Sequence, residues 1–258
     1  MGKSNLVKRL FGNVNTTRGF FRLICADINR HYQQYNVKFG FWAPIKEASK
    51  AQQRGVETTL LNNAIKLCNL YKANRQYVTV FDIGANFGFL SLVWAQTICS
   101  DNGKVVAFEP NKQVCDSFKK SIKKNRLEAI ITLENVVVGS ENKTVELFLN
   151  YTTSNVLKPE KISDSVSIPM VTMDTYVLEN NFDTCDLIKI DVDGIELDIL
   201  QGCLYTLERF KPIFIVETND NMEIIDFFME KNYKVLDMSL KEYAKGTVLP
   251  PNIFCVPI

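Results

Sequence analysis

The sequence predicts an α/β domain with a doubly wound, mainly parallel sheet. From residue 77 onward, short apolar segments alternate with segments that have the periodicity of amphipathic helices. Strands that alternate with helices form βαβ units, in which helices cover both faces of a parallel sheet. The length of 258 residues, of which 46% are hydrophobic, suits one globular domain with a small appendage.

The elements can be assigned in chain order from their apolar patterns. The predicted strands are apolar segments rich in β-branched and aromatic residues, and they cover residues 77–84, 104–110, 131–139, 144–150, 167–174, 186–194, 212–219, 233–239 and 252–258. The predicted helices have apolar residues at helical spacing, and they cover residues 87–98, 111–125, 195–210 and 221–232.

The cysteines indicate a reducing environment. There are seven, an odd number, and no two are spaced Cys-x-x-Cys. This pattern argues against a disulfide framework and against a structural zinc site. The most apolar early stretch is short and is broken by Arg22, which is not typical of a signal peptide. We therefore expect a cytoplasmic protein.

The N-terminal segment is basic although the whole chain has a net charge of only +1. Residues 1–54 contain ten Lys or Arg against Asp27 and Glu47, and eight aromatic residues are interleaved with them. We predict a helical extension or cap over residues 1–55 and the main domain over 56–258. The charge suits an anionic membrane surface or a phosphorylated substrate, and nucleic acid less well. The alternative is a solvated cap whose aromatic residues pack on the main domain.

In a doubly wound sheet, ligands bind at the carboxyl ends of the strands, where the strand order reverses. The residues that follow the predicted strands should therefore line the binding site. Four of these positions are acidic, namely Asp82, Glu109, Asp191 and Glu217.

The turn after the first strand of the main domain suits an adenosyl ligand. Its two glycines permit a tight turn into a helix, whose free N–H groups can meet a polar ligand. The dinucleotide fingerprint requires a third glycine that is missing here. A carboxylate at Asp82 attracts an ammonium group, and Glu109 can accept hydrogen bonds from ribose hydroxyls. The predicted ligand is S-adenosylmethionine, held by Asp82, Gly84, Ala85, Asn86, Gly88, Glu109 and Pro110.

Four motifs in this order resemble the FkbM-type family of class I S-adenosylmethionine-dependent methyltransferases. They are VFDIGANFGFLS, VVAFEPN, DLIKIDVDGIELDILQG and PIFIVET, within residues 77–220. The resemblance implies a Rossmann-like, seven-stranded sheet whose last strand is antiparallel. Asp193 departs from the family, which commonly has Glu at this position.

The carboxylates after the fourth parallel strand are the candidate catalytic groups. A hydroxyl acceptor needs a general base or a metal that lowers its pKa. Asp191 or Asp193 could take the proton, and together with Glu196 they could hold a divalent ion. Glu196 also fits a helix-start capping box, so we do not favour a metal site. Lys189, in an otherwise buried strand, is expected to pair with Asp82 or Asp191 and to tune the site.

Two further residues are predicted to contact the acceptor. Glu217 ends a strand at the site edge, and Asn155 lies in a polar segment between two predicted strands. The resemblance favours an O-methyltransferase acting on a sugar hydroxyl of a glycan or glycolipid. The alternatives are a methyltransferase for RNA or a small molecule, and a non-catalytic module that binds an adenosyl ligand.

Overall fold

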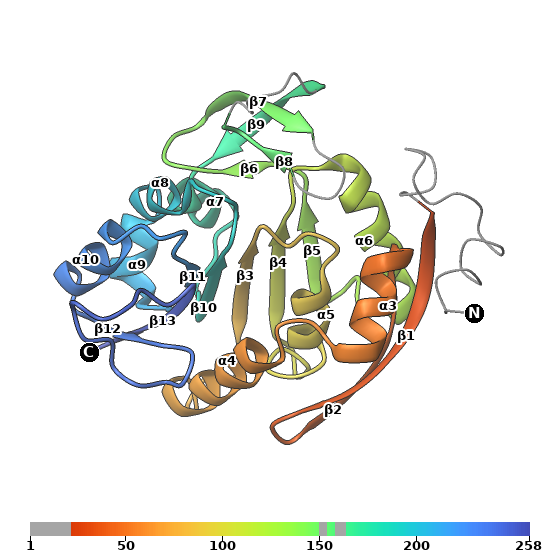
Figure 1. The fold of residues 1–258 in the computed structure, drawn as a ribbon, viewed down its shortest axis with the longest axis horizontal. Helices are drawn as coiled ribbons and strands as arrows, with labels where there is room; N and C mark the ends of the chain where they lie inside the picture. Colours follow the sequence, from red (N-terminus) through yellow and green to blue (C-terminus); the bar gives the residue numbers. More distant parts are fainter. Residues whose placement is uncertain (1–21, 150–153, 158–163) are drawn as a thin grey trace.

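A central seven-stranded sheet with helices on both faces organises the protein (Figure 1). The computed structural model describes residues 22–149, 154–157 and 164–258. The strand order is β12-β13-β11-β10-β3-β4-β5, and only β13 runs antiparallel to its neighbours. The predicted fold class is therefore confirmed. The strands are β3 (Thr79–Ile83), β4 (Lys104–Phe108), β5 (Ile131–Glu134), β10 (Leu187–Ile190), β11 (Ile213–Glu217), β12 (Tyr233–Leu236) and β13 (Asn252–Pro257).

The strand order reverses between β3 and β10, the two strands at the centre of the sheet. Every residue of both strands is buried. Lys189 of β10 is the register partner of Asp82 of β3, so both side chains leave the sheet on the same face. The binding site is expected at this reversal, because the loops that leave the two strands diverge there.

The sheet divides the hydrophobic core into two clusters, one on each face, and helices cover both clusters. The helices α4 (Thr58–Tyr71), α5 (Phe89–Ala95) and α6 (Lys112–Asn125) cover the face that carries Asp82 and Lys189. The other face is covered by α7 (Met173–Glu179), α8 (Glu196–Gln201), α9 (Leu204–Phe210) and α10 (Glu223–Glu230).

The predicted helix over residues 195–210 is two helices instead of one. Helix α8 ends before Gly202, whose backbone packs directly against the main-chain oxygen of Gly139. Any side chain at residue 202 would overlap that oxygen. This close approach ends α8, and α9 begins after Cys203.

A second sheet follows β5 and lies beyond the carboxyl ends of β4 and β5 (Figure 1). Its order is β6-β9-β7-β8, with antiparallel pairing of β7 and β9. The sequence predicted strands here but not their assembly into a separate sheet. The strands are β6 (Val137–Val138), β7 (Lys143–Leu149), β8 (Ser154–Asn155) and β9 (Ser165–Val171).

The prediction of a helical extension is wrong for residues 23–44, which form a β-hairpin. Strand β1 (Leu23–Tyr32) pairs with β2 (Tyr35–Pro44), and only the following α3 (Ile45–Arg54) is helical within the described part of residues 1–55. Alternate residues of β2 are buried, including Val37 and Phe39. This period of two is the pattern of a half-buried strand.

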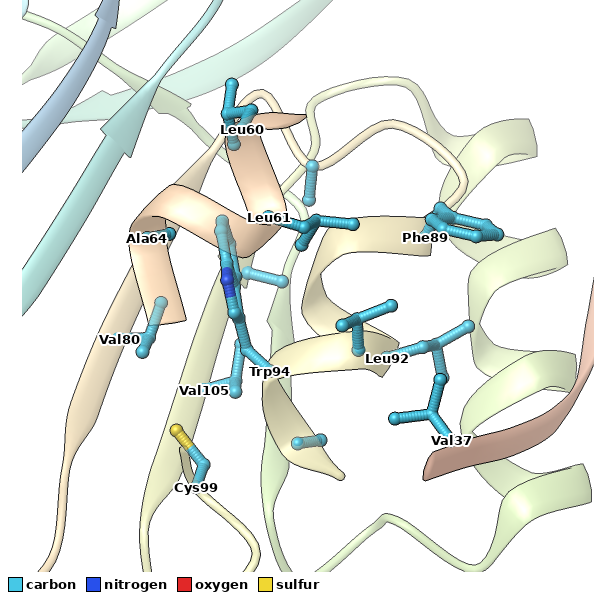
Figure 2. Packing of buried hydrophobic residues seen from close by; sticks show 14 of the residues in the cluster. Val37, Leu60, Leu61, Ala64, Val80, Phe89, Leu92, Trp94, Cys99 and Val105 are labelled. Atoms are coloured by element: carbon cyan, nitrogen blue, oxygen red, sulfur yellow. The ribbon is translucent and has the colours of Figure 1, made fainter. Parts of the chain in front are cut away.

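The hairpin packs into the core of the main sheet. The rings of Phe39 and Phe41 meet the Phe89 ring of α5 edge-on, at centroid distances of 5.4 and 5.3 Å. Figure 2 shows Val37 of β2 beside Leu92 of α5, with Leu61 of α4 nearby. Phe39 and Phe41 of the basic segment therefore pack on the main domain. The division at residue 55 stays a prediction.

Candidate active site

A cavity of about 370 Å³ opens at the carboxyl edge of the sheet, where the strand order reverses. One wall is the turn after β3, and another is formed by the ends of β10 and β11. Helix α3 and the start of α4 complete the lining. Of the residues predicted from the sequence, the lining includes Asp82, Gly84, Ala85, Asn86, Glu109, Pro110, Lys189, Asp191, Asp193 and Glu217.

The turn after β3 needs both glycines for steric reasons. Gly84 has φ +77°, and a side chain there would overlap the main-chain oxygen of Asp191. Gly88 has φ +78°, and a side chain there would overlap the ring of Phe118. These left-handed conformations favour glycine. Gly88 supports the turn without lining the cavity.

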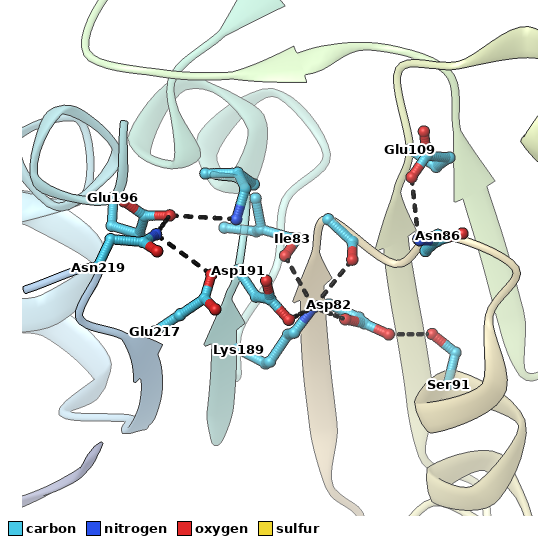
Figure 3. Close-up of polar contacts among 12 residues, drawn as sticks. Asp82, Ile83, Asn86, Ser91, Glu109, Lys189, Asp191, Glu196, Glu217 and Asn219 are labelled. Atoms are coloured by element: carbon cyan, nitrogen blue, oxygen red, sulfur yellow. Dashed lines mark hydrogen bonds and ion pairs between the residues drawn. The ribbon is translucent and has the colours of Figure 1, made fainter. Parts of the chain in front are cut away.

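A buried lysine links the two central strands (Figure 3). The Nζ of Lys189 donates to the main-chain oxygen of Gly84 at 2.9 Å. It also lies 3.5 Å from Asp82 Oδ1 and 3.4 Å from Asp191 Oδ2, which confirms the predicted pairing. Burial lowers the pKa of Lys189, but the Asp191 and Asp82 carboxylates outweigh it and raise that pKa. Lys189 is therefore held as a cation.

Asp82 is completely buried on β3. Its Oδ2 accepts a hydrogen bond from Ser91 Oγ of α5 at 2.5 Å. Its Oδ1 accepts no hydrogen bond within the part of the chain that the structure describes, although Lys189 lies nearby. An additional donor at the cavity could satisfy this oxygen, so the residue suits the ammonium group of an adenosyl ligand.

Asp191 and Glu217 form a coupled pair of carboxyl groups at the ends of β10 and β11. Lys189 lowers the pKa of Asp191, against the opposing effect of burial. Burial, the charge of Asp191 and a hydrogen bond between the two side chains raise the pKa of Glu217 to about 7. Near neutral pH, Asp191 is the ionised member and Glu217 exchanges the proton.

Glu109 follows β4 and is 8% exposed. Its Oε2 accepts the N–H of Asn86 at 2.9 Å, and its Oε1 accepts the N–H of Asn111 at 2.8 Å. Burial raises the pKa of Glu109 to about 7, against these hydrogen bonds. Each oxygen has a remaining lone pair for a ligand hydroxyl.

Glu196 and Asn155 lie outside the lining of this cavity. Glu196 is 2% exposed, and its carboxylate accepts the N–H groups of Val192 and Gly194 and the Nδ2 hydrogen of Asn219. It therefore holds the loop after β10. The predicted capping box is not formed, because α8 begins at Glu196 itself, with Ile195 at the N-cap and no side-chain cap. Asn155 Nδ2 donates to the main-chain oxygen of Asp193 at 2.8 Å. These positions do not support direct acceptor contacts.

The acidic loop does not assemble a metal site in the described part of the chain. No three His, Cys, Asp or Glu side chains there converge in a way that could hold an ion. Asp193 lines the cavity with φ +60°, whereas Glu196 turns into the loop.

No described helix is both long and apolar enough to cross a bilayer.

The sequence interpretation missed the residues that α3 and α4 contribute to the cavity. They include Glu47 and Lys50 of α3 and Glu57 at the start of α4. Glu47 and Lys50 lie in residues 1–55, which the sequence analysis assigned to an extension or cap, and Glu57 lies just after them. No sequence signal connects these residues with the turn after β3. Ser91, which donates a hydrogen bond to Asp82, is the last residue of the motif VFDIGANFGFLS, but the motif alone did not mark it as a site residue.

Comparison with known proteins decides the family. The model of the methyltransferase FkbM domain matches residues 82–237, which is more than half of the chain. The chain belongs to the FkbM methyltransferase family. The predicted resemblance is thus confirmed, the protein is a methyltransferase, and FkbM membership implies the use of S-adenosylmethionine. No curated protein matches the chain.

Solved structures with a similar fold include other methyltransferases. An FkbM methyltransferase from Methylobacillus flagellatus KT is 15% identical, with a TM-score of 0.49 over 70% of this chain and 44% of its own. A methyltransferase from Geobacter sulfurreducens is 12% identical, with a TM-score of 0.48, and the match covers 82% of this chain and 87% of the other. An O-methyltransferase from Bacillus cereus in complex with SAH is 14% identical, with a TM-score of 0.46, and the match covers 82% of this chain and 87% of the other.

Proposed function

We propose that this FkbM methyltransferase is an O-methyltransferase that methylates a sugar hydroxyl of a glycan or glycolipid. The observation that carries the hydroxyl acceptor is the carboxyl pair of Asp191 and Glu217, which lines the cavity beside the turn after β3. A hydroxyl must lose its proton as it is methylated, and this pair can receive it. The sugar itself is proposed from the family resemblance.

The residues around the turn suit the cofactor. When bound, S-adenosylmethionine supplies a methyl group on a sulfonium that is already reactive. The Oδ1 of Asp82, which accepts no hydrogen bond in the described structure, suits the ammonium group, and the remaining lone pairs of Glu109 suit the ribose hydroxyls. Lys189 forms ion pairs with both Asp82 and Asp191 and so fixes the positions of the two carboxylates. Orientation of the acceptor toward the methyl group supplies much of the rate enhancement in such a reaction.

We assign the proton transfer to the pair, with Glu217 as the member that changes its protonation. With S-adenosylmethionine bound, Glu217 would accept the hydroxyl proton of the acceptor as the acceptor oxygen takes up the methyl group and S-adenosylhomocysteine is left. Asp191 is a weaker base because Lys189 lowers its pKa. Glu217, with a pKa of about 7, matches neutral conditions.

Calorimetric titration with S-adenosylhomocysteine, and separately with NAD, tests the cofactor assignment. Only the first ligand should bind, and Asp82→Ala and Glu109→Ala should each weaken binding. Asp191→Ala should spare binding and slow methyl transfer. Binding of neither ligand would contradict the assignment and favour a non-catalytic module.

Transfer of labelled methyl to a panel of neutral glycosides tests the acceptor and the base. Glu217→Gln should bind S-adenosylhomocysteine like the parent but lose roughly 100-fold or more in kcat, the range typical for a general base. The parent rate should rise with pH through about 7, because the base acts as the carboxylate. A Glu217→Gln variant with the parent rate and pH profile would contradict this role.

A further inference from the structure

The part of the cavity lining that α3 and the start of α4 contribute carries charges that bear on the choice of acceptor. Among the described residues of the lining, seven are acidic and two are lysines. One of these lysines, Lys189, is buried between Asp82 and Asp191, so its charge is already balanced. The remaining lysine is Lys50 of α3, which lines the cavity together with Glu47 and Glu57.

Glu57 brings an exposed carboxylate to the cavity. It occupies the position before the first turn of α4, with φ +43°, a conformation that is strained for this residue. Its side chain does not cap the helix, and it is exposed at the cavity.

The turn after β3 and Glu109 are assigned to the cofactor, which leaves the wall of α3 and α4 to the acceptor. We propose that Glu47 and Glu57 select the acceptor, by favouring a hydroxyl compound without a phosphate or carboxylate group near the reacting hydroxyl. This inference rests on the proposed function. Carboxylates accept hydrogen bonds from sugar hydroxyls and repel anionic groups in a partly enclosed site.

The acidic lining argues against two partners that the charge of the basic N-terminal segment left open, namely nucleic acid and phosphorylated substrates. Nucleic acid and phosphorylated sugars both bring phosphate groups to the reacting atom. An acidic lining disfavours both of them, whereas a neutral glycan hydroxyl meets hydrogen-bond acceptors. An RNA acceptor would need cations at the cavity, since phosphate contacts dominate the affinity of proteins for nucleic acid.

The acceptor panel can test this charge selection directly. Labelled methyl is offered with neutral oligosaccharides, with the same oligosaccharides carrying phosphate, and with RNA oligonucleotides. The parent should label the neutral set at least tenfold faster than either anionic set. In Glu47→Lys/Glu57→Lys this ratio should fall at least tenfold. The control Glu128→Lys/Glu179→Lys changes the net charge equally at exposed positions outside the cavity, and its ratio should match the parent.

Preferential labelling of RNA or of phosphorylated sugars would overturn the proposal while leaving the methyltransferase assignment intact. So would an unchanged ratio in the lysine variant. S-adenosylhomocysteine should bind Glu47→Gln/Glu57→Gln as it binds the parent. Weaker binding would assign the wall to the cofactor instead. Failure of the parent to bind S-adenosylhomocysteine would contradict the proposed function itself.

A second measurement needs no acceptor. A cationic and an anionic paramagnetic probe of equal size are added in turn, and the broadening of the Glu57 and Asn86 amide signals is compared. The cationic probe should broaden both at least about twofold more, because an acidic lining concentrates cations. Equal broadening by the two probes would overturn the proposal.

Discussion

At the scale of single residues, the site depends on a close approach between two backbones. The main-chain oxygen of Asp191 occupies the space where residue 84 would carry a side chain. This contact brings the end of β10 against the turn after β3, so the carboxylates of the two strands face one cavity. The conformation of Gly84 is therefore part of the site as well as of the turn.

Replacing Gly84 by Ala should be strongly destabilising. Strain at φ +77° adds to the overlap with Asp191, so we expect a loss on the order of 3 kcal/mol in the free energy of unfolding. Gly246→Ala is the matched control, since Gly246 has φ +92° but nothing within 4 Å of an added side chain. It should lose only about 1 kcal/mol. Urea denaturation measures both, and equal losses would contradict the role of the close approach.

The protonation of Glu109 should control the affinity for S-adenosylhomocysteine. Burial holds its pKa at about 7, so the carboxylate forms as the pH rises from about 6 to 8. The ionised group accepts hydrogen bonds more strongly, and binding should tighten over this range. Glu109→Gln should bind roughly tenfold more weakly at pH 8, and this step in affinity should disappear. Calorimetry at several pH values measures it, and an unchanged step in the variant would assign the titration to another group.

At the scale of elements, β3 and β10 are joined by a buried charge pair as well as by their ladder of hydrogen bonds. Lys189 and Asp82 are register partners on the face covered by α4 and α5. Both side chains are almost completely buried, so loss of Lys189 would leave the Asp82 carboxylate without a compensating charge. The pair therefore stabilises the arrangement of the two strands that define the site.

Lys189→Met should be destabilising because it leaves the Asp82 carboxylate buried without a cation. Loss of one partner of a buried pair costs on the order of 3–5 kcal/mol. Lys189→Met/Asp82→Asn should recover part of this loss, since the orphaned charge is gone. Lys234→Met, which breaks an exposed pair with Glu242, should cost less than about 1 kcal/mol. Urea denaturation compares them, and a double variant as unstable as the single one would contradict the charge explanation.

At the scale of the whole molecule, the hairpin and the main sheet share one core. Ser121 Oγ and Ser117 Oγ of α6 bind the main chain of Trp42 in β2, and the rings of Phe39 and Phe41 pack on α5. Helix α3 then continues from the hairpin to the wall of the cavity. The N-terminal segment thus contributes to both stability and the site.

The protein should therefore unfold in one cooperative transition. Its two tryptophans report on different parts, because Trp42 lies in the hairpin and Trp94 in α5. Trp42→Phe and Trp94→Phe each leave one reporter. In each variant, the fluorescence and circular dichroism transitions in urea should coincide. An earlier transition of Trp42 alone would show that the extension is a separate domain.

Much of the fold and of the site could be predicted because it depends on short-range patterns. The alternation of apolar segments with segments of helical periodicity predicts the parallel sheet. The family resemblance implies an antiparallel last strand, which is β13. The acidic residues Asp82, Glu109, Asp191 and Glu217 were found because parallel strands bring their carboxyl ends to one edge. The prediction of a helical extension was wrong for residues 23–44, because it rested on the basic charge and not on the period of two in residues 37–43.

The sequence by itself determined the fold class, the glycine turn and the acidic residues around it, since these depend on neighbours in the chain. Only the tertiary structure decided that Lys189 joins Asp82 to Asp191, that Glu196 holds a loop, and that Glu47 and Glu57 line the cavity. Each of these contacts joins distant segments or depends on where a side chain turns. Packing of whole elements sets such contacts, and local propensity carries no information about them.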